Sequence, residues 1–388
     1  MPGTHSLLSP SAAHRWLTCP PSARLHAKLN ERLGDQGSVF AREGTQAHAL
    51  AELKLRRENG EINEFNFSAQ RKLLGDLPKW AEQVTDYYVD IVLEKLYSAR
   101  KVCPDAQLFV EQRLDMSRWV PQCFGTSDAV IVSDQTLEVL DLKAGQGVPV
   151  DAVGNPQARL YALGAINAFG DLYGFKSIRE TIIQPRLDSV TEETLSLDDL
   201  LQWGESIGPA AQLAWKGQGE FNPGEHCRFC AAKAICAARA TKAMSIFENG
   251  FDSPDVIPEE NIAGILKVAD MAEAWLHDIR SYAYQQAMKG EQFAGFKLVR
   301  GRAPKRTWTN EDEVIDQMAR AGYAKEQYTE QPKLMSVAAL EKSIGKTAFK
   351  ALLAPLTQQG EAQLILVPES DKREEYSSAD MAFSDLAD

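Results

Sequence analysis

The fold of this chain is decided by two neighbouring stretches, GTSDAVIV at residues 125–132 and LEVLDLKAG at residues 137–145. Both are rich in β-branched and aliphatic residues, and a short polar turn separates them, so together they predict a β-hairpin. Side chains alternate along a strand, so we expect Asp141 and Lys143 to project to one side while the neighbouring leucines face the core. Asp128 adds a carboxylate from the first strand. Two carboxylates and an ammonium at one sheet edge predict a place to hold a divalent metal and polarise a water molecule.

The composition is that of a globular protein with a sizeable core. The chain has 388 residues, enough for two domains or for one domain with a large appendage. No apolar run approaches the roughly 20 residues that span a bilayer, and the N-terminus lacks a signal-peptide pattern. We therefore expect a cytoplasmic protein with no membrane partner.

The charge of the chain narrows the function classes. A formal net charge of −12 argues against a protein that coats nucleic acid through bulk electrostatics. An enzyme acting on phosphates is still allowed, because local basic clusters and bound metal decide that contact.

The segments around the hairpin alternate between helical and extended patterns. The first is a short helix that we expect Ser9 to cap and Pro20 to end. Hydrophobic spacing predicts further helices at residues 43–57, 77–99, 156–164, 197–215 and 261–288. Period-two patterns predict further strands at residues 107–114 and 177–187. This order of elements predicts an α/β fold with a mixed central sheet flanked by helices.

The character of the chain changes beyond residue 249. We expect a first domain at residues 1–245, a mostly helical domain at residues 250–368 with helices near 312–320 and 337–353, and a disordered acidic tail at residues 369–388. Residues 297–308 form a basic stretch interleaved with apolar side chains. That stretch either contacts phosphates and stacks bases or is a solvated strand and turn, and the sequence favours neither.

Three cysteines are clustered late in the first domain, namely Cys227, Cys230 and Cys236. In a reducing compartment this spacing indicates metal ligands rather than disulfides. Thiolates suit either an iron–sulfur cluster or tetrahedral zinc, and His226 offers an alternative zinc ligand. Cys103 and Cys123 fit neither pattern, and we expect them to be ordinary buried thiols.

Further polar side chains fit the hairpin site. His48, on an early helix, offers an imidazole to a metal, although a single helical histidine is more often a core or surface residue. Gln157 and Tyr161 are spaced i, i+4 and so share a helix face, a spacing that also arises by chance. Glu111, one strand earlier, is a further candidate for the metal shell.

Taken in order, these pieces resemble the RecB-like branch of the PD-(D/E)XK nuclease superfamily over the first domain. The resemblance rests on four motifs, namely Gly44-Thr45-x-x-His48, Gly125-x-x-Asp128, Asp141-Leu142-Lys143 and Gln157-x-x-x-Tyr161. It implies a restriction-endonuclease-like fold in which Mg²⁺ or Mn²⁺ is ligated by His48, Asp128, Asp141 and the backbone carbonyl of Leu142. It also implies that Lys143 orients the attacking water or stabilises developing charge, while Gln157 and Tyr161 line the site and steady the DNA.

The cysteines extend the resemblance to a subgroup. An early Cys-Pro followed much later by C-x₂-C-x₅-C resembles the iron–sulfur members, as in AddB-type helicase-nucleases and CRISPR-associated RecB-like exonucleases. This implies a [4Fe–4S] cluster on Cys19, Cys227, Cys230 and Cys236, with structural zinc as the alternative. Either metal would staple the first helix to the end of the domain.

These expectations combine into a function. We expect a metal-dependent DNA nuclease, an exonuclease rather than an endonuclease, that serves phage DNA recombination or processing. The last third of the chain resembles a region of phage and prophage proteins of uncharacterised function, through GFK at residues 295–297 and VPESDKR at residues 367–373. This implies a phage-encoded protein in the bacterial cytoplasm, with DNA and a phage annealing or recombination protein as partners. The alternatives are a non-catalytic DNA-binding or assembly factor that keeps the nuclease fold, and a structure-selective endonuclease.

Overall fold

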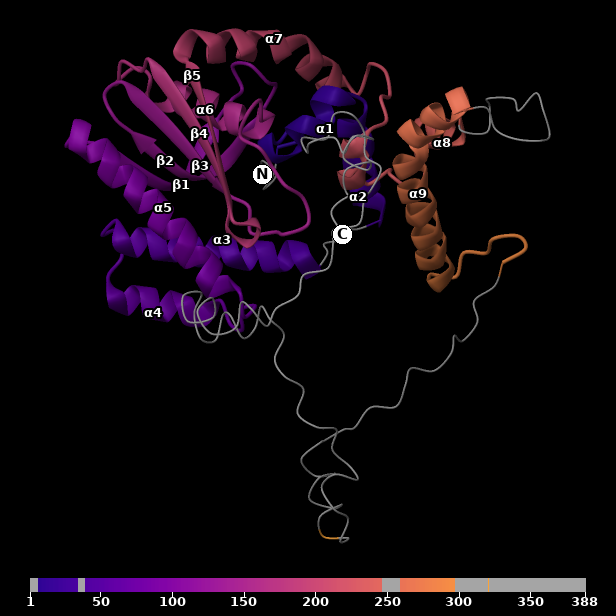
Figure 1. Cartoon of the computed structure of the whole chain (residues 1–388), viewed down its shortest axis with the longest axis horizontal. Helices are drawn as coiled ribbons and strands as arrows, with labels where there is room; N and C mark the ends of the chain where they lie inside the picture. Colours follow the sequence, from indigo (N-terminus) through magenta and orange to yellow (C-terminus); the bar gives the residue numbers. More distant parts are fainter. Residues whose placement is uncertain (1–5, 34–38, 246–258, 297–319, 321–388) are drawn as a thin grey trace, which may run out of the picture. The chain divides into compact units, whose positions relative to one another are not determined.

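The structure is a computed structural model that describes residues 6–33, 39–245, 259–296 and 320. The chain divides into two compact units, residues 1–293 and 294–388, and every element below belongs to the first. Its centre is a five-stranded sheet in the order β1-β2-β3-β4-β5 (Figure 1). The strands are β1 (Gln107–Asp115), β2 (Phe124–Val132), β3 (Thr136–Leu142), β4 (Ser177–Gln184) and β5 (Ser189–Ser196).

Helices surround this sheet and follow it in the chain. The α-helices are α1 (Ala13–Thr18), α2 (Ser22–Leu33), α3 (Val39–Glu58), α4 (Glu64–Leu73), α5 (Ala81–Val102), α6 (Pro156–Phe169), α7 (Leu197–Lys216), α8 (Ala237–Met244) and α9 (Glu259–Met288). Three 3-10 turns accompany them: η1 (Pro10–Ala12), η2 (Pro185–Leu187) and η3 (Glu225–Phe229). None of the helices in the described part of the chain combines the length and apolarity that a membrane crossing needs.

The sheet is mixed because of one crossover. β1, β2 and β3 form an antiparallel meander, and β4 and β5 form an antiparallel hairpin. β3 and β4 are parallel, with Leu142 opposite Ile183, and α6 lies in the connection between them. A parallel pair needs such a crossover, since its second strand must restart at the same end of the sheet. The predicted α/β class, a mixed sheet flanked by helices, is confirmed.

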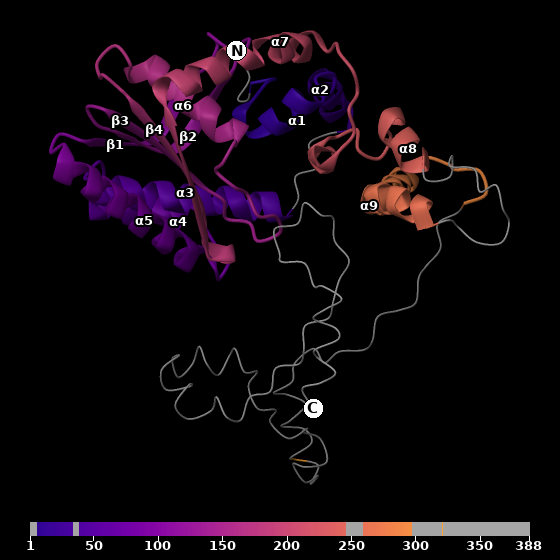
Figure 2. The ribbon, with the colours of Figure 1, turned by 45° about the horizontal axis from the view of Figure 1, so that its top comes forward.

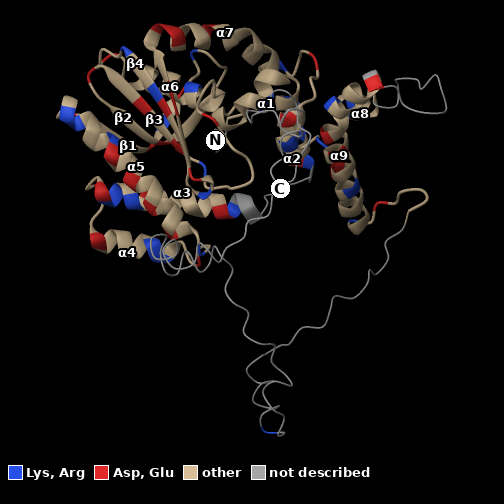
Figure 3. Ribbon diagram, viewed as in Figure 1, with Lys and Arg blue, Asp and Glu red and all other residues tan. Residues whose placement is uncertain are grey.

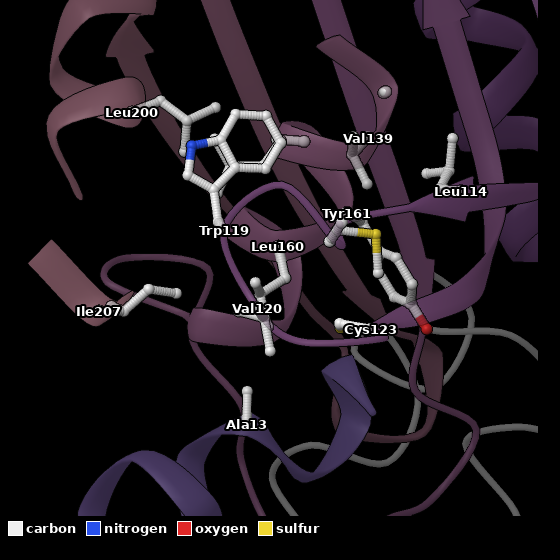
Figure 4. Packing of buried hydrophobic residues seen from close by; sticks show 14 of the residues in the cluster. Ala13, Leu114, Trp119, Val120, Cys123, Val139, Leu160, Tyr161, Leu200 and Ile207 are labelled. Atoms are coloured by element: carbon white, nitrogen blue, oxygen red, sulfur yellow. The ribbon is translucent and has the colours of Figure 1, made fainter. Parts of the chain in front are cut away.

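Both faces of the sheet are buried, each against its own set of helices. On one face Leu140 and Leu142 pack with residues of α3 and α5, and on the other Leu137 and Val139 pack with residues of α1, α6 and α7. Figure 1 and Figure 2 both place α3 and α5 on one side of the sheet and α6 and α7 on the other. Figure 4 shows Leu160 and Tyr161 of α6 as members of the second core. The continuous apolar run of β3 fits a strand that is buried on both faces.

The helix α6 lies close against the strands because one of its residues has no side chain. A Cβ on Gly164 would come within 2.5 Å of Met116 Sδ and 2.9 Å of Leu114 Cβ. Only glycine fits such a contact without movement of the chain.

At Glu111 the side chains of β1 exchange faces, so that apolar residues before and after it pack into opposite cores. Before this residue Leu108 and Val110 join the core under α3 and α5, whereas after it Leu114 joins the core under α6. Glu111 has φ 51°, in the left-handed region, and the β1–β2 register is the same on both sides of it. One left-handed residue thus turns the strand over without shifting its pairing.

Most predicted elements are present, but four elements were not predicted. They are α2, α4, α8 and β5, and α3 begins at Val39 rather than near residue 43. The opening helix exists as η1 and α1, but the Ser9 side chain makes no capping hydrogen bond within the described ranges. In the predicted apolar stripe of α9, Ala272 is buried, whereas Ile262, Leu266 and Leu276 are exposed. The basic stretch at residues 297–308, the helices near 312–320 and 337–353 and the acidic tail lie outside the described residues, apart from residue 320.

Candidate active site

The first pair of predicted site residues comes from elements far apart in the chain. His48 lies on α3 and Asp128 on β2, and His48 Nδ1 lies 3.0 Å from Asp128 Oδ1 although 80 residues separate them. Asp128 Oδ2 accepts a hydrogen bond of 2.7 Å from the backbone N–H of Leu142 at the end of β3. The Asp128 carboxylate therefore joins α3, β2 and β3 at one point.

The second group is a closed triangle of side chains on the α6 side. Lys143 Nζ lies 2.7 Å from Asp141 Oδ2 and donates a 2.9 Å hydrogen bond to Gln157 Oε1. Gln157 Nε2 in turn donates to Asp141 Oδ1 at 2.9 Å. Asp141 and Lys143 therefore lie on one side of β3, as the alternation along the strand predicted.

The side chains best placed to bind a metal lie on α3, β1 and β2, whereas the sequence predicted a site on the hairpin of β2 and β3. Ligand atoms of His48, Glu111 and Asp128 all lie within 4.8 Å of one another, which makes them a possible set of metal ligands. Glu111 reaches this position through the left-handed backbone described above. Asp141 is not in this set of three and is instead engaged with Lys143 and Gln157. Glu111, named above only as a further candidate, therefore has a more direct place in the site.

Burial opposes negative charge on the carboxylates of Glu111, Asp141 and Asp128. Burial, and then the charges of Asp128 and Glu52, raise the pKa of Glu111 to about 7. Burial raises the pKa of Asp141, an effect that Lys143 opposes and Asp128 reinforces. Burial disfavours charge on Asp128 as well, but His48 and the Leu142 N–H outweigh it and lower its pKa.

His48 carries a proton where a metal would bind. Burial lowers its pKa, but the charge and hydrogen bond of Asp128 more than compensate and raise the pKa to about 9. The proton on His48 thus serves as the counter-ion of the carboxylates. A hard divalent cation fits this set, because it would replace that proton and be held by carboxylate oxygens and one imidazole.

The loop between β3 and α6 is held by hydrogen bonds and places Gln157 beside Asp141 and Lys143. In residues 144–155, the backbone N–H of Val150 donates to Gln184 Oε1 at 2.7 Å, and Gln184 Nε2 donates to the carbonyl of Val148 at 3.0 Å. The loop ends at Asn155, whose side chain caps α6 by accepting the N–H of Gln157 at 3.0 Å. A buried glutamine and a capped helix therefore fix the Gln157 backbone.

Tyr161 lies one turn further along α6 and is buried. Burial and the charges of Asp141 and Asp128 raise its pKa, so the hydroxyl stays protonated. A Cβ on Gly125 would come within 3.0 Å of Tyr161 Cε1 and 3.2 Å of Pro10, which explains why a glycine precedes the Asp128 motif. The structure thus brings together seven of the residues named from the sequence, namely His48, Asp128, Asp141, Leu142, Lys143, Gln157 and Tyr161.

The predicted cysteine ligands converge on a second location. A pocket near the end of α1 is lined by the four predicted thiols together with His226, namely Cys19, Cys227, Cys230 and Cys236. Cys19 ends α1, whereas the other three lie in or beside η3 and at the start of α8. Cysteine thiolates ligate iron–sulfur clusters and zinc, so this pocket is a candidate site for either, although its thiols do not form a set of closely spaced ligand atoms like that of His48, Glu111 and Asp128.

Buried cations surround this pocket. Arg15 is only 6% exposed and Arg239 only 3%. Burial raises the pKa of both Cys230 and Cys227, while Arg15 opposes this at Cys230 and Arg239 opposes it at Cys227. Two guanidinium groups thus compensate the negative charge that metal-bound thiolates would carry.

Residues beside the cysteine pocket also contact the helix α9. Arg239 Nη1 lies 2.6 Å from Asp278 Oδ2, and Lys233 Nζ lies 3.1 Å from Asp278 Oδ1. Trp275 Nε1 donates to the carbonyl of Ala234 at 3.1 Å. These contacts fasten α9 to the segment that carries the cysteines.

The two cysteines outside the pocket differ from each other. Cys123 is buried, and its Sγ donates to the carbonyl of Leu8 at 3.0 Å. Cys103 is only partly buried, at the end of α5, so the expectation of a buried thiol was wrong there.

Comparisons with known proteins give a family and one weak structural likeness. A family model described as a protein of unknown function (DUF2800) matches residues 5–374. A solved structure titled "Crystal structure of SSO0001" matches at 18% identity and a TM-score of 0.22, covering 55% of this chain and 94% of that chain. At that score the likeness carries no argument about fold or function.

Proposed function

The chain belongs to the DUF2800 family, whose function is unknown, and we propose that it is a metal-dependent deoxyribonuclease. The observation that carries the proposal is the convergence of His48, Glu111 and Asp128 as possible ligands beside the triangle of Asp141, Lys143 and Gln157. These residues come from two helices, three strands and the segment after β3, so no single local element brings them together.

The arrangement suits phosphodiester hydrolysis. A bound Mg²⁺ or Mn²⁺ would supply a more acidic water and positive charge next to the phosphate. Asp128 and Glu111 would hold the cation, and His48 could join them as a ligand only after losing its proton. The metal also explains how an acidic site attracts an anionic substrate, because the carboxylates are then neutralised.

We assign to Lys143 the role of contacting the reacting phosphate and the attacking water. Its ammonium is held between Asp141 and Gln157 while its side chain is still 26% exposed. A cation fixed in this way stabilises negative charge developing on a phosphate and needs little rearrangement during the reaction. Figure 3 shows basic and acidic residues interspersed along α3, α4 and α5, so we assign substrate attraction to the site rather than to these helices.

We propose that the cysteine pocket holds a [4Fe–4S] cluster, with zinc as the alternative. Support comes from the four thiols on one pocket and the two buried arginines beside it. Protein purified anaerobically should be brown, with a broad visible absorbance that Cys230→Ser removes. A colourless preparation that contains stoichiometric zinc would identify zinc instead.

The activity is tested with purified protein, Mn²⁺ and linear DNA labelled at the 5′ or the 3′ end. We expect wild-type protein to degrade the DNA and Asp141→Asn to be inactive. Asp134→Asn is the matched control, since Asp134 is an exposed residue in the turn of the same hairpin. Equal degradation by wild type and Asp141→Asn would refute the assignment.

The substrate form separates the related activities. An exonuclease leaves covalently closed circular DNA intact, whereas a structure-selective endonuclease cuts circles that contain the right structure. Metal binding and DNA binding without cleavage would instead favour an assembly factor. Single-stranded and double-stranded substrates, with and without an added annealing protein, test the proposed role in recombination.

A further inference from the structure

The helix α5 contributes a buried hydroxyl that has no partner. Tyr88 is 1% exposed, and its Oη makes no hydrogen bond to any residue that the structure describes. A buried hydroxyl without a partner costs free energy, so a retained one usually meets a water molecule or a ligand. Phenylalanine would fill the same apolar space without this cost.

The surroundings of Tyr88 place it behind the candidate active site. It belongs to the core that contains Ala47, Val110, Ala129 and Leu142, together with Leu140. These are the chain neighbours of the site residues: Ala47 precedes His48, Val110 precedes Glu111, Ala129 follows Asp128, and the two leucines flank Asp141.

The electrostatics agree with this placement. After burial, the groups that raise the pKa of Tyr88 are the carboxylates of Asp128, Asp141 and Glu111. These three residues lie on three adjacent strands. The hydroxyl therefore lies on the α5 side within reach of the charges of these carboxylates, one of which, Asp141, Gln157 contacts from the α6 side.

We propose that Tyr88 is a positioning residue whose hydroxyl donates a hydrogen bond to a water molecule held among the carboxylates of Glu111, Asp128 and Asp141. A donor suits this position, since the carboxylates around it can only accept. The water would in turn orient the metal-binding carboxylates from behind. This inference rests on the proposed function for the identity of the site, but its main measurement does not require cleavage.

The test is Tyr88→Phe, with Tyr87→Phe as the matched control, because Tyr87 is the adjacent residue and is 38% exposed. We expect Tyr88→Phe to weaken Mn²⁺ binding about tenfold, measured by electron paramagnetic resonance, with a melting temperature equal to or above that of wild type. In the cleavage assay kcat should fall about 10- to 100-fold while KM for DNA is unchanged. The control should match wild type in every measurement.

The outcomes separate this inference from the nuclease proposal. If wild type does not cleave DNA but Tyr88→Phe still weakens Mn²⁺ binding, the nuclease proposal fails and the role of Tyr88 stands. If wild type cleaves DNA and Tyr88→Phe equals it in Mn²⁺ affinity and kcat, the hydroxyl has no positioning role. A fall in melting temperature with unchanged Mn²⁺ affinity would likewise overturn the inference, because Tyr88 would then act only in packing.

Discussion

The candidate active site and the cysteine pocket differ in what surrounds them. The active site lies in a sheet covered on both faces by large cores that together include Leu137, Leu140 and Leu160. Among the residues that the structure describes, the hydrophobic cluster at the cysteine pocket contains three buried members, Leu29, Cys230 and Ala232. At the first location the fold can hold the ligands in place before a metal arrives, whereas at the second the protein has little apolar burial to hold the segment.

With a metal proposed at each location, this contrast predicts opposite roles for them. A metal at the carboxylates would serve chemistry and add little to the stability of the sheet. A metal at the thiols would stabilise the segment between α7 and α9, as in small domains that fold around their ligands. Four substitutions test the contrast, each expected to affect one location and leave the other intact.

The largest effect is expected for Asp128→Asn. It removes a proposed metal ligand and the negative charge that pairs with His48. We therefore expect Mn²⁺ affinity to fall about 100-fold or more and the cleavage rate to fall about 1,000-fold or more. Iron or zinc content should equal that of wild type, because the cysteine pocket is untouched. Metal analysis and the end-label assay measure both, with Asp134→Asn as control. Loss of the thiol-bound metal in Asp128→Asn would contradict the separation of the two locations.

Cys230→Ser should show the reverse pattern. We expect loss of the thiol-bound metal and a fall of roughly 100-fold in amide-exchange protection between residues 225 and 244, with α9 following because Asp278 is tied to Arg239. Exchange in β2 and β3 should be unchanged. Cys103→Ser is the control, since this thiol lies outside the pocket. Uniform loss of protection over the whole first unit would show that the two regions unfold together.

Glu180→Gln tests the sheet region alone. Glu180 on β4 is fully buried opposite Glu193 on β5, and burial, reinforced by the charge of Glu193, raises its pKa to about 9. Between its ordinary pKa of 4.5 and about 9 the unfolded chain loses this proton and the folded chain keeps it, so stability falls as pH rises through that window.

Replacement by the uncharged amide should therefore stabilise the protein at pH 8 by up to about 5 kcal/mol and have little effect at pH 4.5. Denaturant unfolding at the two pH values measures this, and Glu225→Gln is the exposed control. An equal change at both pH values would show that packing, not ionisation, is responsible.

The smallest effect is expected for Asp278→Asn. The amide can still accept a hydrogen bond from Arg239, but it loses the ion pairs with Arg239 and Lys233. We expect amide exchange in α9 to rise about tenfold, an effect of roughly 1 kcal/mol, while cleavage and metal content are unchanged. Asp270→Asn, at an exposed position of the same helix, is the control. Unchanged exchange in α9 would show that Trp275 packing alone holds the helix.

The sequence predicted the parts of the fold whose pattern is local. The hairpin of β2 and β3 is visible because its apolar residues and its Asp141-Leu142-Lys143 ending are contiguous. α4 was missed because none of its described residues is buried, so it carries no apolar stripe. β5 was missed because its side chains are mostly polar and none is fully buried.

The grouping of the site residues was predicted, but their arrangement was not. The spacing of the motifs cannot show that His48 contacts Asp128 rather than Asp141, since that depends on how α3 crosses the sheet. The place of Glu111 was hidden for a different reason. Its left-handed backbone breaks the alternation from which faces are predicted, so the strand pattern assigns it no fixed side.

The inversion at Glu111 also limits how this protein can vary. A residue inserted or deleted beside it would shift one half of β1 against β2 and turn that half's apolar side chains out of their core. Substitutions in this strand are therefore tolerated one position at a time, whereas a change in its length is not. Length variation in relatives should therefore be excluded from β1 and accumulate in exposed connections between elements.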